Sequence, residues 1–254
     1  MLAVSTAAST SSLPSPGTFF LDAAKKVASV TLPGLIAGFL AFGVGSRLAM
    51  RVLALTSRDA VQGAETDAGA IIGEITFGGT MFLIVVGAFL GAGAGLLFLA
   101  GRRWLPAEGW KQGLAFGALL LALTGRLLID PDNLDFLLLD PAWLAVAMFG
   151  ALPLLFGLAF VALHERLRGW IGRDRSPRVT AVLLLPMLLP LAIGIFPALI
   201  VAIATGIAYI VVRTEMAPRW ERSRLVDAAG RTVLAAVGAV GLWLFASGAA
   251  EILT

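Results

Sequence analysis

The chain has 254 residues, of which 59% are hydrophobic and only 14% are charged, and its formal net charge is +3. An ordinary soluble domain is roughly 45–50% apolar and about 25% charged. Since a soluble fold could not cover this much apolar surface, the composition predicts an all-α, polytopic helical bundle in a lipid bilayer. There is no cysteine and a single histidine, His164, which excludes disulfides, thiolate metal sites and a haem held by two histidines of this chain.

The basic residues lie in short segments between apolar runs, which indicates membrane topology and not nucleic-acid binding. The sequence holds no Walker-type phosphate loop, haem motif or dinucleotide fingerprint. We therefore expect no cofactor, no metal and no nucleic-acid partner.

The N-terminal residues 1–24 are rich in Ser, Thr, Ala and Pro and lack a charged region before a compact apolar core. They predict a flexible tail and not a cleaved signal peptide. Residues 25–254 are expected to form a single transmembrane domain. Its apolar runs predict about seven spans, at about 27–55, 75–100, 112–129, 141–163, 179–194, 196–212 and 232–252.

The uncharged stretch 179–212 decides the number of spans. As one straight helix it would be about 50 Å long at 1.5 Å per residue, whereas a hydrocarbon core is about 30 Å thick. Pro186, Pro190, Gly194 and Pro197 favour a break, and we predict two short spans joined by a tight reversal. A re-entrant segment, an unwound substrate-lining stretch and one kinked helix are the alternatives.

Orientation follows from the distribution of Lys and Arg. Placing the N-terminus inside and the C-terminus outside leaves only Arg58 in an outer connection, and the cytoplasmic bias predicts a multi-pass protein of the cell membrane, the inner membrane of a bacterium. A single span at 179–212 would move the arginines of 213–231 outside, so seven spans are preferred over six. The cytoplasmic residues are Lys25, Lys26, Arg102, Arg103, Lys111, Arg166, Arg168, Arg173, Arg175, Arg178, Arg213, Arg219, Arg222, Arg224 and Arg231.

The first four predicted spans have the pattern of an internal duplication. A shift of 79 positions lays Gly34, Leu35, Gly38, Leu40, Arg47 and Leu48 onto Gly113, Leu114, Gly117, Leu119, Arg126 and Leu127. The hypothesis is that two copies of one helical hairpin build the bundle. The alternative is coincidence, because Gly and Leu recur by chance in apolar sequence.

Three arginines near the outer ends of spans are the clearest candidates for a site, because an arginine at mid-bilayer costs roughly 2.5–3.5 kcal/mol on insertion scales. Arg47 and Arg51 are four residues apart and share a helix face, which we predict to be mostly opposite the small residues Gly34, Gly38, Ala41 and Gly45. The functional hypothesis is a polar pocket for an anion or a lipid head group. Its predicted residues are Arg47, Arg51, Glu74, Arg126 and Asp130.

The alternative for these arginines is a structural one, in which they snorkel to the interface or lock helix ends together by ion pairs. Glycines at four-residue spacing, Gly87, Gly91 and Gly95 and then Gly113 and Gly117, predict close helix packing inside the chain, with homodimerisation as the alternative. His164 and Glu165 resemble an acid/base pair, but neighbours on a helix do not direct their side chains to one point, so catalysis is not expected there.

The predicted function is a non-enzymatic membrane protein, either permease-like or an accessory membrane subunit, with an anion or lipid head-group site on its outer side. No Asp or Glu lies in the middle of a predicted span, which disfavours a proton-driven carrier. One alternative is a membrane-embedded enzyme for lipid-linked substrates that uses Asp132 or Asp135, and another is a structural scaffold.

Overall fold

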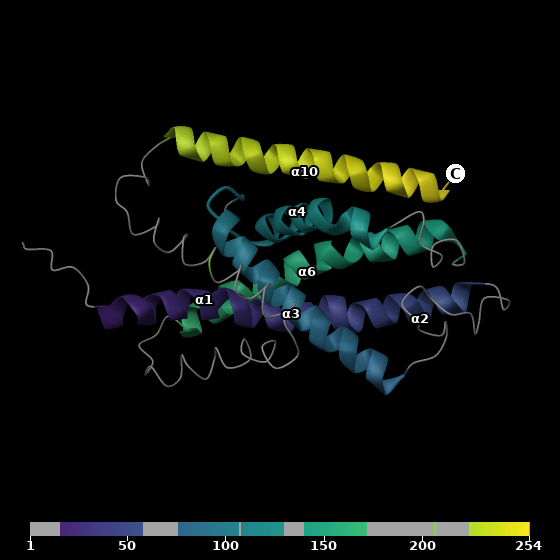
Figure 1. Ribbon diagram of the computed structural model, residues 1–254, viewed down its shortest axis with the longest axis horizontal. Helices are drawn as coiled ribbons and strands as arrows, with labels where there is room; N and C mark the ends of the chain where they lie inside the picture. Colours follow the sequence, from purple (N-terminus) through teal and green to yellow (C-terminus); the bar gives the residue numbers. More distant parts are fainter. Residues whose placement is uncertain are drawn as a thin grey trace, which may run out of the picture.

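The computed structural model describes residues 16–57, 76–106, 108–129, 140–171, 206 and 224–253. Every regular element in these ranges is a helix (Figure 1). The elements are α1 (Pro16–Gly38), the π-helix η1 (Phe39–Gly45), α2 (Ser46–Thr56), α3 (Phe77–Gly101), α4 (Trp110–Leu128), α6 (Ala142–Ile171) and α10 (Arg224–Leu253). The all-α prediction is confirmed.

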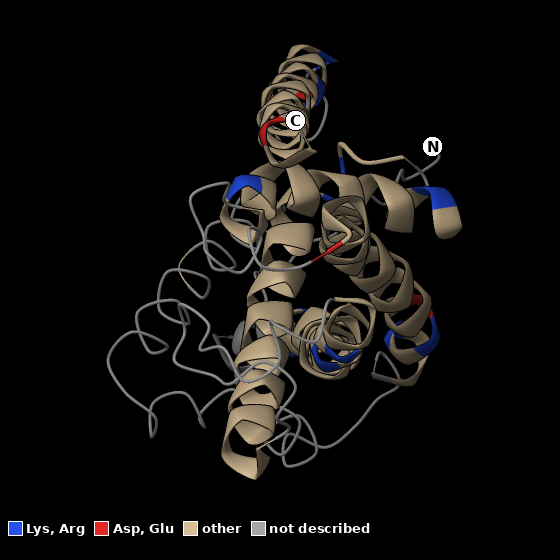
Figure 2. Ribbon diagram, turned by 90° about the vertical axis from the view of Figure 1, so that its right-hand side faces the viewer, with Lys and Arg blue, Asp and Glu red and all other residues tan. Residues whose placement is uncertain are grey.

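Four helical segments in the described part of the chain are long and apolar enough to cross a membrane: Lys25–Thr56, Phe77–Gly101, Ala142–Trp170 and Arg224–Leu253. Charged residues are few on these helices (Figure 2). The third predicted span, 112–129, corresponds to α4, which is helical but carries Lys111 and Arg126 and is not one of these four. The predicted spans 179–194 and 196–212 lie outside the described residues.

α1 begins at Pro16, inside the predicted N-terminal tail of residues 1–24. Proline suits the first helical position, since its fixed φ angle matches the helix and its missing N–H has no partner there. Residues 16–24 therefore belong to the helix, and residues 1–15 of the predicted tail lie outside the described residues.

The helices form two antiparallel hairpins. In the first, α1, η1 and α2 follow one another in a single path that packs on α3, and in the second α4 packs on α6. Contacts between α1 and α6 join the hairpins, and α10 packs mainly on α4. α1 begins at one end of the bundle and α10 ends at the other (Figure 1).

Glycines hold the first hairpin together at backbone distance. A Cβ atom added to Gly91 would overlap the carbonyl oxygen of Gly34, one added to Gly38 would overlap that of Gly87, and one added to Gly95 would overlap that of Val30. Small residues at this spacing allow helix backbones to approach closely. The predicted intramolecular role of this glycine series is confirmed.

The second hairpin uses the same device. A Cβ on Gly117 would lie 2.7 Å from the carbonyl oxygen of Pro153, and one on Gly113 would lie 3.0 Å from that of Gly157. Gly113 and Gly117 are the positions that the 79-residue shift aligns with Gly34 and Gly38. Each pair therefore occupies the same place in its own hairpin, in agreement with the hypothesis of a repeated unit.

The first span contains a feature that the sequence did not predict, the π-helix η1. Its wider turn leaves backbone carbonyls without the usual α-helical pairing. The single hydroxyl proton of Ser46 is shared between the carbonyl oxygens of Phe42 and Gly43, so a buried side chain adds a hydrogen bond at this turn. Because of η1, Gly43 turns toward α3, and a Cβ there would lie 3.0 Å from the Cα of Ile84.

An aromatic cluster fills the core at the end of the bundle where α3 and α6 end. Phe98 contacts Phe116 and Phe160 edge to face, with ring centroids 5.1 and 5.0 Å apart. His164 stacks on Phe160 and is 4% exposed, with Nδ1 2.8 Å from the carbonyl oxygen of Ser29 on α1. His164 thus ties α6 to α1 through a backbone contact.

Glu165, the neighbour of His164, is turned the other way. Its Oε1 accepts a hydrogen bond from the backbone N–H of Gly109 at 2.7 Å, in the turn before α4. The two side chains have different partners on different elements. This divergence agrees with the prediction that they do not converge on one point.

Candidate functional site

The candidate site lies at the end of the bundle where α2, α4 and α10 end and α3 and α6 begin. A small apolar cluster of Leu53, Ile129, Ala145 and Val146 joins α2, α4 and α6 there, and α10 packs against it. The backbone N–H of Asp140, just before α6, donates to the hydroxyl of Ser57 at 3.1 Å. These contacts bring the ends of distant segments together.

Arg47 extends from the start of α2 to the start of α3. A Cβ added to Gly79 would lie only 2.5 Å from Nη2 of Arg47, so the guanidinium rests against the glycine backbone. Nε of Arg47 is buried and has no hydrogen-bond partner among the described residues. A buried donor without an acceptor is uncommon in proteins, which makes Arg47 a candidate for ligand binding.

The first turn of α3 supplies further donors beside Arg47. Thr76 caps this helix, and its Oγ1 accepts from the N–H of Gly79 at 3.2 Å. A Cβ on Gly78 would meet no atom within 4 Å, so the helix start is open on that side. A helix N-terminus carries partial positive charge from its unpaired N–H groups. A guanidinium beside it is unfavourable until an anion lies between them.

Arg126 occupies a different surface. Its Nη2 lies 3.7 Å from Oε2 of Glu251 in the last turn of α10, and its Nη1 donates to the carbonyl oxygen of Ile129 at 3.5 Å. Nη1 also lies against Gly248 of α10. Arg126 therefore joins α4 to α10, as the structural alternative predicts.

The described contacts do not bring Arg47 and Arg126 together, because Arg47 contacts α3 whereas Arg126 contacts α10. The prediction that Arg47 lies opposite the small-residue face of its helix is wrong. Gly34, Gly38 and Arg47 all contact α3, because η1 changes the helical phase between them.

The remaining predicted site residues are Arg51, Glu74 and Asp130. Arg51 lies one turn after Arg47 on α2 and is exposed, whereas Glu74 and Asp130 lie outside the described residues. Sequence reasoning missed Glu251 as a partner of Arg126. Glu251 lies at the predicted outer end of the last span, and Arg126 lies at the predicted outer end of the third. Their equal depth in the membrane was the available signal.

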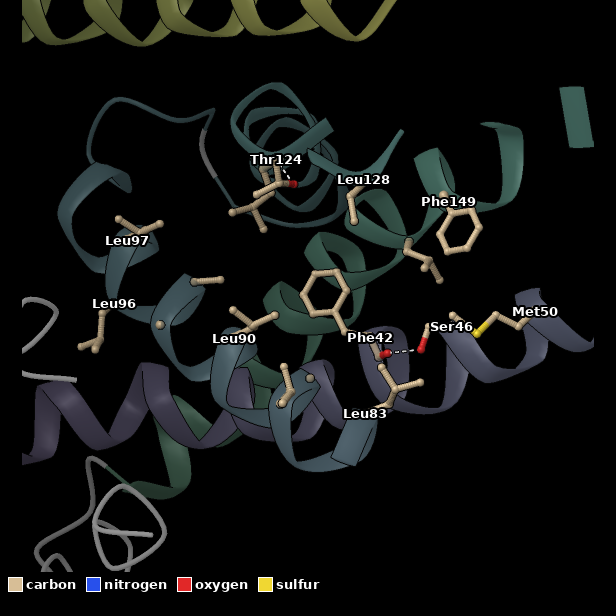
Figure 3. Close-up of a pocket in the computed structure, with 16 residues that line it drawn as sticks. Phe42, Ser46, Met50, Leu83, Leu90, Leu96, Leu97, Thr124, Leu128 and Phe149 are labelled. Carbon is tan, nitrogen blue, oxygen red and sulfur yellow. Dashed lines mark hydrogen bonds between the residues drawn. The ribbon is translucent and has the colours of Figure 1, made fainter. Parts of the chain in front are cut away.

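A groove of about 530 Å³ runs along the bundle between α3 and α4, with η1 and α2 at its base (Figure 3). Its walls include Phe42 and Met50 from the first span, Leu90 from α3 and Phe149 from α6. The polar side chains lining it are Ser46 and Thr124. Both hydroxyls donate to carbonyl oxygens of their own helices, Thr124 to Leu120 at 2.8 Å, so the groove presents an apolar surface.

Within the ranges that the structure describes, no three His, Asp or Glu side chains gather in a way that could hold a metal ion. No known protein family, curated protein or solved structure matches this chain.

Proposed function

We propose that this protein is a multi-pass protein of the cell membrane, the inner membrane of a bacterium, that binds an anionic group where α2 meets the start of α3. The bound group is a small anion or a lipid head group, and the protein acts as a permease-like bundle or as an accessory membrane subunit. The observation that carries the proposal is the buried Nε of Arg47, which lacks an acceptor among the described residues and stands beside a capped helix N-terminus.

Electrostatics supports an anion at this place. The guanidinium of Arg47 and the N–H groups of the first turn of α3 are all donors, and both carry positive charge. An anion between them would accept hydrogen bonds from both, as anions do at helix N-termini. Arg51 adds a second positive charge one turn along α2, while Glu74 and Asp130 remain predicted neighbours from the sequence.

The proposed orientation keeps seven spans, with the N-terminus inside and the C-terminus outside. It is supported by the gathering of basic segments at the end opposite Arg47. Arg103 Nε donates to Asp227 Oδ1 at 3.1 Å, which joins the turn after α3 to the start of α10. Arg168 lies 4.0 Å from Glu108, which joins the end of α6 to the same turn. The positive-inside rule places such an end in the cytoplasm.

The orientation is open to a direct test, since the chain has no native cysteine. A cysteine that replaces Glu108 should be protected from a membrane-impermeant maleimide in intact cells and labelled after the cells are opened. Labelling in intact cells would overturn the orientation.

The anion site is tested by thermal unfolding of the purified protein in a neutral detergent, with inorganic phosphate as the probe at constant ionic strength. A ligand that binds only the folded state stabilises it by about 2.7 kcal/mol at a hundred times its Kd, so phosphate should raise the Tm of the wild type. Arg47→Gln should abolish that rise, and Arg231→Gln, on exposed α10 surface, should keep it. An equal rise in Arg47→Gln contradicts the proposal.

A further inference from the structure

We propose that the groove between α3 and α4 holds one acyl chain of an anionic phospholipid whose phosphate head group lies at Arg47. This inference rests on the proposed anion site and extends it from a charge to a ligand class. It joins two neighbouring features of the bundle, an apolar groove and, beside it, an arginine whose Nε has no acceptor among the described residues.

The groove has the chemistry of an acyl-chain site. The hydroxyls of Ser46 and Thr124 are already occupied by carbonyl oxygens of their own helices, so the walls hold no side-chain donor for a polar ligand. The cavity of about 530 Å³ lies in the range of pockets that hold small molecules, about 300–1,000 Å³. Leu90, which lines it, is 51% exposed, so a chain can enter sideways.

The groove is long enough to hold one acyl chain. On α3 the lining residues extend from Leu83 to Leu97, and these fourteen positions correspond to about 21 Å at 1.5 Å per residue. One leaflet of a hydrocarbon core of about 30 Å is about 15 Å deep. A single extended acyl chain therefore fits along the groove, and a short soluble anion would leave it unfilled.

Arg47 does not line the groove, but it lies beside it, between the lining residues Ser46 and Met50 along the helix. Its guanidinium touches Gly79, which precedes Leu83 by one helical turn on the same stripe of α3. The neighbouring residue, Ser46, lines the groove itself (Figure 3). A chain lying between Leu83 and Leu97 would thus place its phosphate beside Arg47 and the first turn of α3.

Charge complementarity selects an anionic lipid over a zwitterionic one. The guanidinium and the N-terminus of α3 present positive charge only, and a head group with its own ammonium group would meet repulsion there. Phosphatidylglycerol is the probe that combines a phosphate, no cation and two acyl chains. Glycerol 1-phosphate carries the head-group charge without the chains and serves as the soluble comparison.

The test is native mass spectrometry of the full chain in detergent, titrated with phosphatidylglycerol or phosphatidylcholine of equal chain length. The wild type should bind one phosphatidylglycerol in preference to phosphatidylcholine. Leu90→Trp, which fills the groove, should weaken that binding about tenfold, a loss of roughly 1.4 kcal/mol. Leu127→Trp makes the same exchange on the outer surface of α4, where Leu127 is 83% exposed, and should change nothing.

A milder variant covers the case in which Leu90→Trp does not fold. Thr124→Cys places a thiol in the groove, and phosphatidylglycerol should slow its alkylation about tenfold, as expected for a site that is about nine-tenths occupied. Leu127→Cys on the same helix should be alkylated at the same rate with and without lipid. Equal protection of both thiols would overturn the proposal, because it would indicate a general lipid coat.

The two proposals fail in different ways. Suppose that Arg47→Gln loses the binding of phosphate and phosphatidylglycerol, but Leu90→Trp does not weaken phosphatidylglycerol binding and the lipid does not protect the thiol of Thr124→Cys. The groove inference is then wrong and the anion site stands. If Arg47→Gln retains the response to phosphate and glycerol 1-phosphate, the anion site is wrong. Equal binding of phosphatidylcholine and phosphatidylglycerol by the wild type overturns the assignment of an anionic lipid.

Discussion

The two hairpins of this bundle start from nearly the same pattern and place their arginines on different surfaces. In each, a pair of glycines four residues apart is followed by an arginine thirteen residues after the first glycine, Gly34 to Arg47 and Gly113 to Arg126. In each, the glycines pack on the partner helix of the same hairpin. Arg47 then contacts that same partner, α3, whereas Arg126 turns away from α6 and contacts α10.

The difference is caused by η1. In a straight α-helix with 3.6 residues per turn, a residue thirteen positions on lies about 220° around the axis, which is the far side. α4 is straight and obeys this rule. The π-helical turn between Gly38 and Ser46 contains more residues per turn, which brings Gly43 and Arg47 back toward α3. One local change in helix type thus converts a structural arginine position into a candidate binding position.

The largest expected effect comes from disrupting the close glycine contacts within each hairpin. Gly91→Ala and Gly157→Ala each place a Cβ into the backbone of the facing helix, and overpacking of this kind costs about 1–3 kcal/mol. Both should lower the Tm in detergent. Gly238→Ala on α10, where a Cβ meets no atom within 4 Å, should leave the Tm equal or raise it, since alanine favours a helix by up to about 1 kcal/mol. Equal Tm values for all three variants would contradict the glycine contacts.

An intermediate effect is expected at the π-turn, where the hairpins differ. Ser46→Ala removes the hydroxyl proton that the carbonyl oxygens of Phe42 and Gly43 share, and the loss of one intramolecular hydrogen bond costs about 0.5–1.5 kcal/mol. It should lower the Tm and weaken the response to phosphate, because η1 positions Arg47. The matched control is Thr124→Val in α4, because the hydroxyl of Thr124 donates to one carbonyl oxygen of its own helix. A larger loss in Thr124→Val than in Ser46→Ala would show that the π-turn does not depend on Ser46.

The smallest effect is expected for the Arg126–Glu251 pair. Both side chains are substantially exposed, at 43% and 59%, and exposed ion pairs contribute about 0–1 kcal/mol. A double-mutant cycle of Arg126→Gln and Glu251→Gln should give a coupling in that range, and neither variant should change the response to phosphate. Loss of that response in Arg126→Gln would place Arg126 in the anion site after all.

The all-helical fold and the packing motifs could be predicted from the sequence because they follow from composition and spacing. Long uncharged runs give helices that are apolar enough for a membrane, and the spacing of Gly87, Gly91 and Gly95 gives a close interface whichever helix lies opposite. The start of α1 was not predicted, because apolar residues after Pro16 continue the helix into the predicted tail.

The candidate site was only partly predictable. Arg47 was identified because charge within an apolar helix is costly. The direction of its side chain was not predicted, because η1 replaces α-helical turns by wider ones and no single residue in the sequence indicates this change. Ser46 is the side chain that supports this turn, and a serine inside an apolar helix has many other roles. The pairing of Arg126 with Glu251 depends on which helix packs on α4, and that is set by tertiary contacts.

The attachment of α10 along a single edge has a consequence for assembly. Only 11% of its most apolar part is buried, its closest glycine contacts with α4 are Gly241 on Ala122 and Phe245 on Gly125, and it is the last of the described helices to leave the ribosome. The two hairpins make their mutual contacts without it. Membrane helices insert first and associate afterwards, so α10 is expected to pack onto α4 after the two hairpins have formed.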